Sequence, residues 1–405
     1  MLTPSLSVPA VTYATQHWMA EQDGMSSRAQ LARGSGEYKS AVPTKIAALD
    51  FSVLNSAAAD IEDAVTALIR FDEHARGRLG FSSPTLGPMS SILLRTESTS
   101  SSQIENLTVG ARQLALAELN QSSSANAISV SANVLAMEAA LELSDRVDRT
   151  AILTMHEKLL SGQPGWEHHA GKFRQQLVWV GSSGLSPRGA SFVAPQHDLI
   201  DEFIADLVQF MGRDDLPVLV QIAIAHAQFE TIHPFVDGNG RTGRALVHAL
   251  LRGKGIVRST TAPVSAGLLR NTESYFASLT AYQNGDALPI VEQFGNAARF
   301  AASSGTQLID RLGAELDHSS EMLEGLRPQA MAWKLLPHLI SHPVMNNELV
   351  ASLLATSQTS ALRALQQLSS VGVVSERSGL KRNRIWQHDG ILSVLDDYAV
   401  SLLRK

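Results

Sequence analysis

Cysteine is absent from this chain of 405 residues, and aromatic residues make up only 5% of it. Without thiols the chain has no disulfide framework, no cysteine nucleophile and no cysteine-ligated zinc. The net charge of −6 argues against a protein that coats nucleic acid by bulk electrostatics. The longest apolar runs, such as Val218–Ala225, are too short to cross a bilayer, and the N-terminus lacks a signal-peptide pattern. These absences predict a cytoplasmic protein with no membrane partner.

Apolar residues recur at helical spacing in much of the sequence, so the expected fold class is mainly α. Residues 1 to about 40 show little periodicity and are expected to form an arm. A Ser/Thr-rich run, Thr96–Ser102, is expected to precede a helix rather than to lie in one. The expected helices cover Ala47–Arg78, Gln103–Asn120, Val130–Leu143, Arg149–Ser161, Asp198–Met211, Pro217–Thr231, Arg241–Arg252 and Ile290–Leu323.

Two segments depart from that pattern. Lys172–Gly181 and Ala190–Ala194 are β-rich runs on either side of a Gly/Pro-bearing loop, which predicts a small hairpin. Near the C-terminus, helices at Ala330–Ile340, Asn346–Leu354 and Thr359–Ser370 precede strands at Val373–Glu376 and Asn383–Gln387. That order is typical of a winged helix. Its basic residues favour either a DNA backbone or a protein partner; they are Arg363, Arg377, Lys381, Arg382 and Arg384.

The segment His233-Pro-Phe-Val-Asp-Gly-Asn-Gly-Arg-Thr-Gly-Arg244 carries the most information. Arg241 and Arg244 are three residues apart, so they share a face if a helix begins after Gly240. Cations at a helix N-terminus oppose its dipole, and a bound anion such as a polyphosphate removes that conflict. The loop therefore predicts a phosphate site.

The other residues of the segment fit that chemistry. His233 is suited to act as a general base near neutral pH. Asp237 is placed to hold magnesium beside a phosphate, and Gly238 and Gly240 allow close approach of the backbone. Asn239 is expected to donate to a phosphate oxygen. Phe235 is expected to anchor the loop in the core, and Gly243 to allow close helix packing.

Two better-known phosphate motifs do not fit. The three glycines satisfy G-x-G-x-x-G, but a dinucleotide fold needs a preceding strand and an acidic residue about twenty positions later. An amphipathic helix precedes these glycines instead, and the region near Thr260 offers only Ser and Thr. No G-K-[ST] follows them, which excludes a Walker A loop.

The segment resembles the Fic family signature H-x-F-x-[DE]-G-N-G-R-x-x-R at every fixed position. The resemblance runs from about Tyr38 to Arg299 and implies a Fic-type helical core with a β-hairpin flap that pins a target peptide. It implies transfer of AMP from ATP to a Ser, Thr or Tyr hydroxyl of a protein, with His233 as the base and Mg2+ held by Asp237. The implied nucleotide-binding residues are Gly238, Asn239, Gly240, Arg241, Thr242, Gly243 and Arg244, with Asn271, Tyr275 and Tyr282 as candidates for the adenosine pocket.

A second match lies upstream. Ser101-Ser-Gln-Ile-Glu105-Asn106 fits the family's inhibitory pattern [ST]-x-x-x-E-[GN]. Ser102 and Glu105 also have the spacing of a helix capping box, and we expect both roles together. The resemblance implies that Glu105 pairs with Arg244, occupies the space of the γ-phosphate and keeps basal activity weak.

The expected segments are an arm at 1–37, a helical region with the inhibitory helix at 38–145, a catalytic core with its flap at 146–300, a linker helix at 301–325 and a winged helix at 326–405. Two alternatives stay open. One is a DNA-binding regulator that only senses nucleotide. The other is a Fic-type enzyme that uses another donor, such as a phosphocholine nucleotide, or removes the modification. The target protein, modification of the chain itself and a homodimer are also left open.

Overall fold

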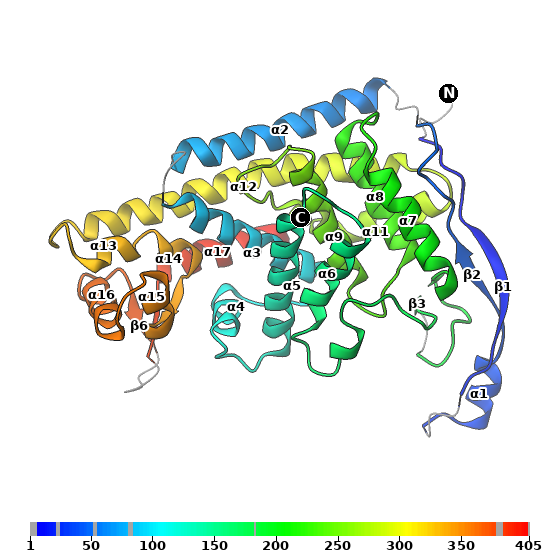
Figure 1. Cartoon of the computed structure of the whole chain (residues 1–405), viewed down its shortest axis with the longest axis horizontal. Coiled ribbons are helices and arrows are strands. Elements are labelled where there is room, and N and C mark those ends of the chain that lie inside the picture. Colours follow the sequence, from blue (N-terminus) through cyan, green and yellow to red (C-terminus); the bar gives the residue numbers. More distant parts are fainter. Residues whose placement is uncertain are drawn as a thin grey trace. The chain divides into compact units, whose positions relative to one another are not determined.

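The computed structural model describes residues 6–21, 25–51, 55–79, 84–181, 184–377 and 384–403. Helices dominate this part of the chain (Figure 1), and the strands form three small antiparallel sheets. The mainly α fold class is therefore confirmed. Among the described helices, none combines the length and the hydropathy that a membrane span requires.

The chain divides into two compact units, each assembled from separate stretches of sequence. Unit 1 consists of Met1–Glu62, Ala139–Lys254 and Glu273–Gly295, and unit 2 consists of Asp63–Glu138, Gly255–Thr272 and Asn296–Lys405. Three long helices continue through the boundaries: α2 (Asn55–Leu79), α5 (Ala125–Glu142) and α12 (Leu288–Met322).

Unit 1 is built around α8 (Val218–Ile232), which Pro217 precedes. Thirteen of its 15 residues are buried, so it is the central helix of this unit. It packs against α7 (Ile200–Met211) and α9 (Asn239–Gly253), and α6 (Arg149–Leu160) packs against α9. A short hairpin of β3 (Trp179–Val180) and β4 (Phe192–Val193) confirms the predicted flap, with much shorter strands than expected. The unit also contains α11 (Thr272–Gln283) and two 3-10 turns, Glu167–His169 and His197–Leu199.

The first forty residues, expected as an arm, contain regular structure. β1 (Thr12–Trp18) and β2 (Gly36–Val42) pair over seven residues in antiparallel register, from Thr12 opposite Val42 to Trp18 opposite Gly36. Between them, α1 (Arg28–Gly34) begins with a capping box formed by Ser27 and Gln30. The ribbon was missed because its supporting contacts come from distant parts of unit 1, which local periodicity does not report.

The predicted helix at 103–120 is wrong. The Ser/Thr-rich run lies inside α3 (Leu86–Ile104), and a separate helix, α4, covers Ala111–Glu118. Buried hydroxyls in α3 donate to the carbonyl four residues earlier, as Ser98 does to Leu94 and Ser100 to Thr96, at 2.9 and 3.0 Å. These bonds satisfy the hydroxyls without water, so the run does not interrupt the helix.

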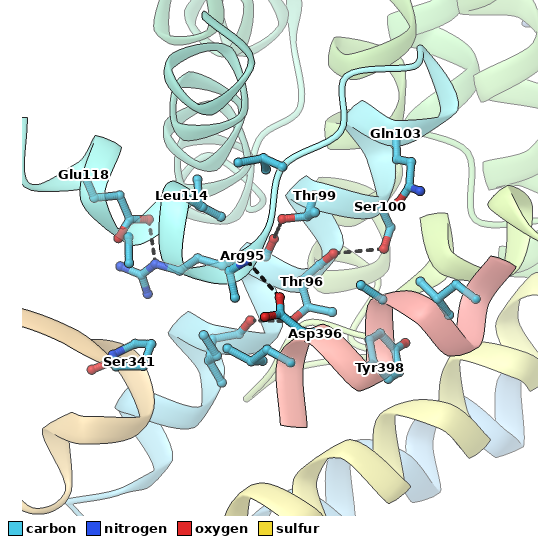
Figure 2. A pocket seen from close by; sticks show the side chains of 18 residues that line it. Arg95, Thr96, Thr99, Ser100, Gln103, Leu114, Glu118, Ser341, Asp396 and Tyr398 are labelled. Carbon is cyan, nitrogen blue, oxygen red and sulfur yellow. Dashed lines mark hydrogen bonds and ion pairs between the residues drawn. The ribbon is translucent and has the colours of Figure 1, made fainter. Parts of the chain in front are cut away.

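In unit 2, α3 is held by several polar contacts. The buried Glu97 accepts the backbone N–H of Ser265 at 2.9 Å and also its hydroxyl, at the start of α10 (Val264–Leu269). Arg95 Nε donates to Glu118 of α4 at 2.6 Å (Figure 2). α3 therefore binds two neighbouring helices through carboxylates.

Figure 2 shows a cavity of about 50 Å³ that α3 lines together with α4 and α17 (Asp389–Leu403). Asp396 of α17 accepts the backbone N–H of Ala111 at 3.2 Å on its wall. Thr96 and Thr99 turn their hydroxyls back to their own helix. The polar groups around the cavity are thus largely paired with one another.

The C-terminal part of unit 2 differs from the prediction in one helix. The expected helix at 330–340 is split at Pro337 into α13 (Met331–Leu335) and α14 (His338–Ser341), because proline interrupts helical hydrogen bonding. The elements that follow are β5 (Val344–Asn346), α15 (Asn347–Leu353), α16 (Gln358–Ser370), β6 (Ser375–Glu376) and β7 (Ile385–Gln387). The three strands form one sheet in the order β5-β7-β6. The winged helix and its DNA contact stay predictions. Lys381 and Arg382 lie outside the described residues, and Arg377 is ion-paired with Asp389 at 2.9 Å.

Candidate active site

His233 ends the central helix of unit 1 in an unusual conformation. Its φ and ψ are 49° and 60°, in the left-handed region, and its N–H donates to Phe229 O at 2.9 Å. Non-glycine residues in this region are uncommon and concentrate at functional sites. The conformation turns the chain sharply between α8 and the loop that leads to α9.

The imidazole of His233 is oriented by the backbone. Nδ1 lies 3.2 Å from the carbonyl oxygen of Glu230. A carbonyl only accepts hydrogen bonds, so in the neutral ring the proton is placed on Nδ1 and Nε2 keeps its lone pair. This arrangement suits Nε2 to accept a proton.

The loop after His233 is fastened to itself and to the core. Phe235 is fully buried, as expected. Asn239 Oδ1 accepts the Phe235 N–H at 2.8 Å and its Nδ2 donates to Phe235 O at 2.9 Å. Both ends of the buried Asn239 amide therefore bond the loop, and donation of its second N–H to a phosphate stays a prediction.

Two glycines fix how closely the helices approach. Gly238 has φ 75° and caps α9, and a Cβ there would lie 2.7 Å from Leu159 Cδ2. A Cβ on Gly243 would lie 2.9 Å from Glu230 Oε1 and 3.0 Å from Phe229 Cδ1. The close packing predicted for Gly243 is thus confirmed. Gly240 lies in the first turn of α9, where backbone N–H groups have no partner within the helix.

Both arginines of the signature are buried in the first two turns of α9. Arg241 Nη2 pairs with Asp237 Oδ2 at 2.9 Å, and the Asp237 side chain keeps 41% of its surface exposed. Thr242, between the arginines, is fully buried. Two cations at a helix N-terminus oppose its dipole, so the conflict expected from the sequence is present in the structure.

Two further residues support this loop through its backbone, and no sequence motif identifies them. His156 of α6 accepts the Gly171 N–H at Nδ1, at 3.1 Å, so its Nε2 carries the proton and donates to Asp237 O, also at 3.1 Å. Burial lowers the pKa of His156 to about 4, which keeps the ring neutral. A histidine on a helix 81 positions from its partner has no local signature.

Arg174 is the second of these residues and is 1% exposed. Its guanidinium donates to three backbone carbonyls: Nε to His233 at 2.8 Å, Nη1 to Gln176 at 2.9 Å and Nη2 to Pro195 at 2.7 Å. Burial lowers its pKa to about 10. One side chain therefore ties the His233 loop to both ends of the flap, here residues 176–195.

Two of the candidates for the adenosine pocket are buried in unit 1. Tyr275 is 1% exposed, and its hydroxyl bonds His226 Nε2 at 2.7 Å. Tyr282 is buried and donates to Gln228 Oε1 at 2.8 Å. The adenosine pocket itself stays a prediction. Asn271 is exposed and belongs to unit 2.

The inhibitory pattern ends a helix rather than starting one. Glu105 is the C-cap of α3, and Ser101 and Ser102 are buried in its last turn. Ser102 Oγ accepts Asn133 Nδ2 at 3.1 Å, so the predicted capping box is wrong. Glu105 belongs to unit 2 and Arg244 to unit 1, and their ion pair stays a prediction.

A magnesium site made only by protein groups is not available in the described part of the chain. No group of three His, Asp or Glu side chains is arranged there to hold a metal. Mg2+ in nucleotide sites commonly uses one or two carboxylates together with the substrate phosphates. The half-exposed Asp237, beside the start of α9, fits that arrangement as a single ligand.

Comparisons with known proteins agree with the signature. Residues 146–251, a segment of unit 1, match the model of the Fic/DOC family. The protein adenylyltransferase fic-1 of Caenorhabditis briggsae is 33% identical over 185 residues, which are 45% of this chain and 32% of that protein. A probable protein adenylyltransferase of Aquifex aeolicus is 31% identical over 126 residues, 31% of this chain and 37% of that protein. The chain thus spans about a third of the length of these curated relatives.

One solved structure is also similar. It is a Fic family protein from Desulfovibrio desulfuricans G20, which is 21% identical, with a TM-score of 0.49, over 80% of this chain and 95% of that one.

Proposed function

We propose that this protein transfers AMP from ATP to a hydroxyl group of a protein side chain. The observation that carries the proposal is the orientation of His233 at the left-handed end of α8, with Nδ1 on the Glu230 carbonyl and the start of α9 six residues further on. The curated relatives that are named protein adenylyltransferases support it.

The reaction forms one bond and breaks one. The hydroxyl oxygen of the target attacks the α-phosphorus of ATP, the bond from that phosphorus to the bridging oxygen of the β-phosphate breaks, and pyrophosphate leaves. The hydroxyl proton moves to His233 Nε2. Because Nδ1 is held by a backbone carbonyl, the ring turns one defined nitrogen toward this proton.

The phosphates need positive groups fixed in advance. The N–H groups in the first turn of α9, which have no acceptor within the helix, and the guanidinium groups of Arg241 and Arg244 supply them. When Mg2+ is bound with the nucleotide, it neutralises phosphate charge. Asp237 would hold it, exchanging its ion pair with Arg241 for the metal. Catalysis by this chain then consists of positioning and electrostatic stabilisation.

We include autoinhibition in the proposal. Glu105 places a carboxylate at the C-terminal end of α3, where a negative charge opposes the helix dipole. A residue whose charge opposes the dipole of its own helix points to a role beyond that helix. The role that the inhibitory pattern supports is pairing with Arg244 in the space that the γ-phosphate needs.

The experiment that tests the transfer compares ATP labelled at the α-phosphate with ATP labelled at the γ-phosphate, in a lysate treated with the Glu105→Gly protein. Protein labelled only by the α label supports AMP transfer. Protein labelled by the γ label would mean a kinase, and no label from either would favour a nucleotide sensor. His233→Ala should abolish α labelling, whereas His197→Ala, an exposed histidine of the same unit, should leave it unchanged.

A further inference from the structure

The flap is too small to hold its own shape. Its two strands have two residues each, and the backbone bonds that close them are Ser191 N–H to Val180 O at 2.9 Å and Ala194 N–H to Val178 O at 3.1 Å. A two-stranded hairpin of ordinary length is only marginally stable by itself. The flap therefore depends on contacts with other parts of the chain. Arg174 supplies such contacts only at the base of the flap, to Gln176 and Pro195.

Further contacts along the flap come from the N-terminal ribbon, defined here as residues 6–42 without the undescribed 22–24. Trp18 at the end of β1 donates from Nε1 to Leu185 O at 2.9 Å. Its ring meets the ring of Trp179 edge to face, with centroids 5.2 Å apart. One side chain thus contacts both the first strand of the flap and the turn that joins its strands.

A second group of contacts joins α1 to the same turn. Arg188 Nη1 donates to the carbonyls of Arg33 and Ser35 at 2.7 and 2.5 Å. Ser186 Oγ donates to Gly34 O at 2.6 Å. These bonds use carbonyls at the end of α1, which would otherwise lack a partner.

β2 continues the contact along β4. Ser40 is fully buried and donates from Oγ to Ala194 O at 2.9 Å. Gln196 Nε2 donates to the Tyr38 hydroxyl at 3.0 Å. The ribbon therefore contacts the flap at its turn and along its second strand (Figure 1).

The ribbon is itself fixed elsewhere in unit 1. The Val8 N–H donates to Gly285 O at 3.0 Å, the Val11 N–H to Gln283 O at 2.8 Å and the Ala287 N–H to Leu6 O at 2.8 Å. These bonds hold its start on the turn between α11 and α12. The ribbon thus joins the flap to a part of the unit that is separate from the His233 loop.

We propose that the N-terminal ribbon is a clamp that sets the position of the flap, with Trp18 and Arg188 as its positioning residues. The role of the clamp in presenting a target protein rests on the proposed function. The mechanical role does not, because it follows from the contacts alone. The mechanical role and the role in target presentation call for different measurements.

The first measurement is hydrogen–deuterium exchange of the full-length Trp18→Ala and Arg188→Gln proteins. We expect the Ser191 and Ala194 amides to exchange about tenfold faster, since each change removes one or two contacts of a hairpin with little stability of its own. Amides of α8 and α9 should keep their rates, which shows that the unit is folded. Tyr13→Ala is the matched control, because Tyr13 lies on the same strand, is 52% exposed and faces away from these contacts. Unchanged exchange at Ser191 and Ala194 in both variants would overturn the clamp.

The second measurement uses the same variants in the Glu105→Gly background. Labelling of lysate proteins from α-labelled ATP should fall at least about fivefold, while the Kd for ATP stays within about twofold, because the clamp acts on the target and not on the nucleotide. Labelling equal to that of Tyr13→Ala, together with faster flap exchange, would refute the link to target presentation. If the parent protein labels nothing, the proposed function fails, and the exchange result still decides the clamp.

Discussion

The ring of His156 lies flat against the ring of Phe235, with centroids 3.6 Å apart and planes 5° apart. His156 also donates to Asp237 O and accepts the Gly171 N–H. A neutral imidazole thus supports the aromatic anchor of the loop, the backbone of its carboxylate residue and the segment that leads into the flap. This relationship makes His156 a positioning residue of the candidate site.

We predict that His156→Ala lowers the free energy of unfolding by about 2–4 kcal/mol. The change leaves a cavity beside Phe235 and removes one hydrogen-bond partner each from the Asp237 carbonyl and the Gly171 N–H. Urea unfolding at pH 7.5 measures this. His17→Ala, an exposed histidine on β1, is the control and should change stability by less than about 0.5 kcal/mol. An equal effect of the two substitutions would refute the assigned role.

Low pH should destabilise the fold through its buried histidines. Burial lowers the pKa of His156 to about 4 and that of His226 to about 3. Between those values and about 6.5 the unfolded chain binds protons that the folded chain excludes, so stability is complete above pH 6.5 and is lost as the pH falls toward 4. Each histidine contributes at most about 1.4 kcal/mol per pH unit.

Urea unfolding at pH 7.5, 6 and 5 tests this pH dependence. His226→Gln should flatten it, since glutamine can still bond the Tyr275 hydroxyl but does not titrate. His17→Ala should leave the dependence as steep as in the parent protein. An identical slope in all three proteins would show that the buried histidines do not cause the acid sensitivity.

The signature loop was predictable because its residues are neighbours in sequence and each type suits one task. The anchoring by Phe235 and the packing of Gly243 both follow from that stretch of twelve residues. His156 and Arg174 were not predictable, because they act on backbone atoms 81 and 59 positions away. Because every residue has a backbone carbonyl, a bond to one does not restrict the residue type of the partner.

The errors at the helices have a related cause. Ser and Thr favour turns when their hydroxyls compete for the backbone in water, which is why 96–102 was read as a break. In α3 the same hydroxyls are buried and bond their own helix, as Thr96 does to Ile92 at 2.9 Å. Tertiary burial reversed the local preference. Tyr275 shows another limit of local patterns, since a helical aromatic gives the same signal in a core as in a pocket.

Gly238 should tolerate no side chain. Gly238→Ala meets both a positive φ of 75° and the methyl carbon of Leu159 at 2.7 Å, and we expect a loss of about 1–3 kcal/mol in unfolding free energy. Gly162→Ala is the control, because a Cβ there meets no atom within 4 Å and φ is not positive. Adding Leu159→Ala to the Gly238 variant should not restore full stability, since the backbone strain remains. Complete restoration would show that crowding alone requires this glycine.

Arg174 should resist conservative replacement. A lysine keeps the charge but has one nitrogen in place of three, so it cannot serve His233, Gln176 and Pro195 together. In the Glu105→Gly background, Arg174→Lys should lower the rate of label transfer at least about tenfold with little change in the Kd for ATP. It should also speed exchange of the Ala194 amide. Lys172→Gln, an exposed neighbour, should alter neither measurement. A variant with normal transfer and slow exchange would remove Arg174 from the positioning groups.

Glu105→Gly tests whether α3 restrains the enzyme, and it should raise the rate of α-label transfer about tenfold or more. The reason is the proposed pairing with Arg244, since removal of the Glu105 carboxylate would leave Arg244 to the phosphates. Glu97 of the same helix is the matched control. It is buried and binds Ser265, so Glu97→Gln should lower stability without activating transfer. If Glu97→Gln activates as strongly as Glu105→Gly, loosening of α3 as a whole releases the activity, and a specific pairing between Glu105 and Arg244 is not its basis.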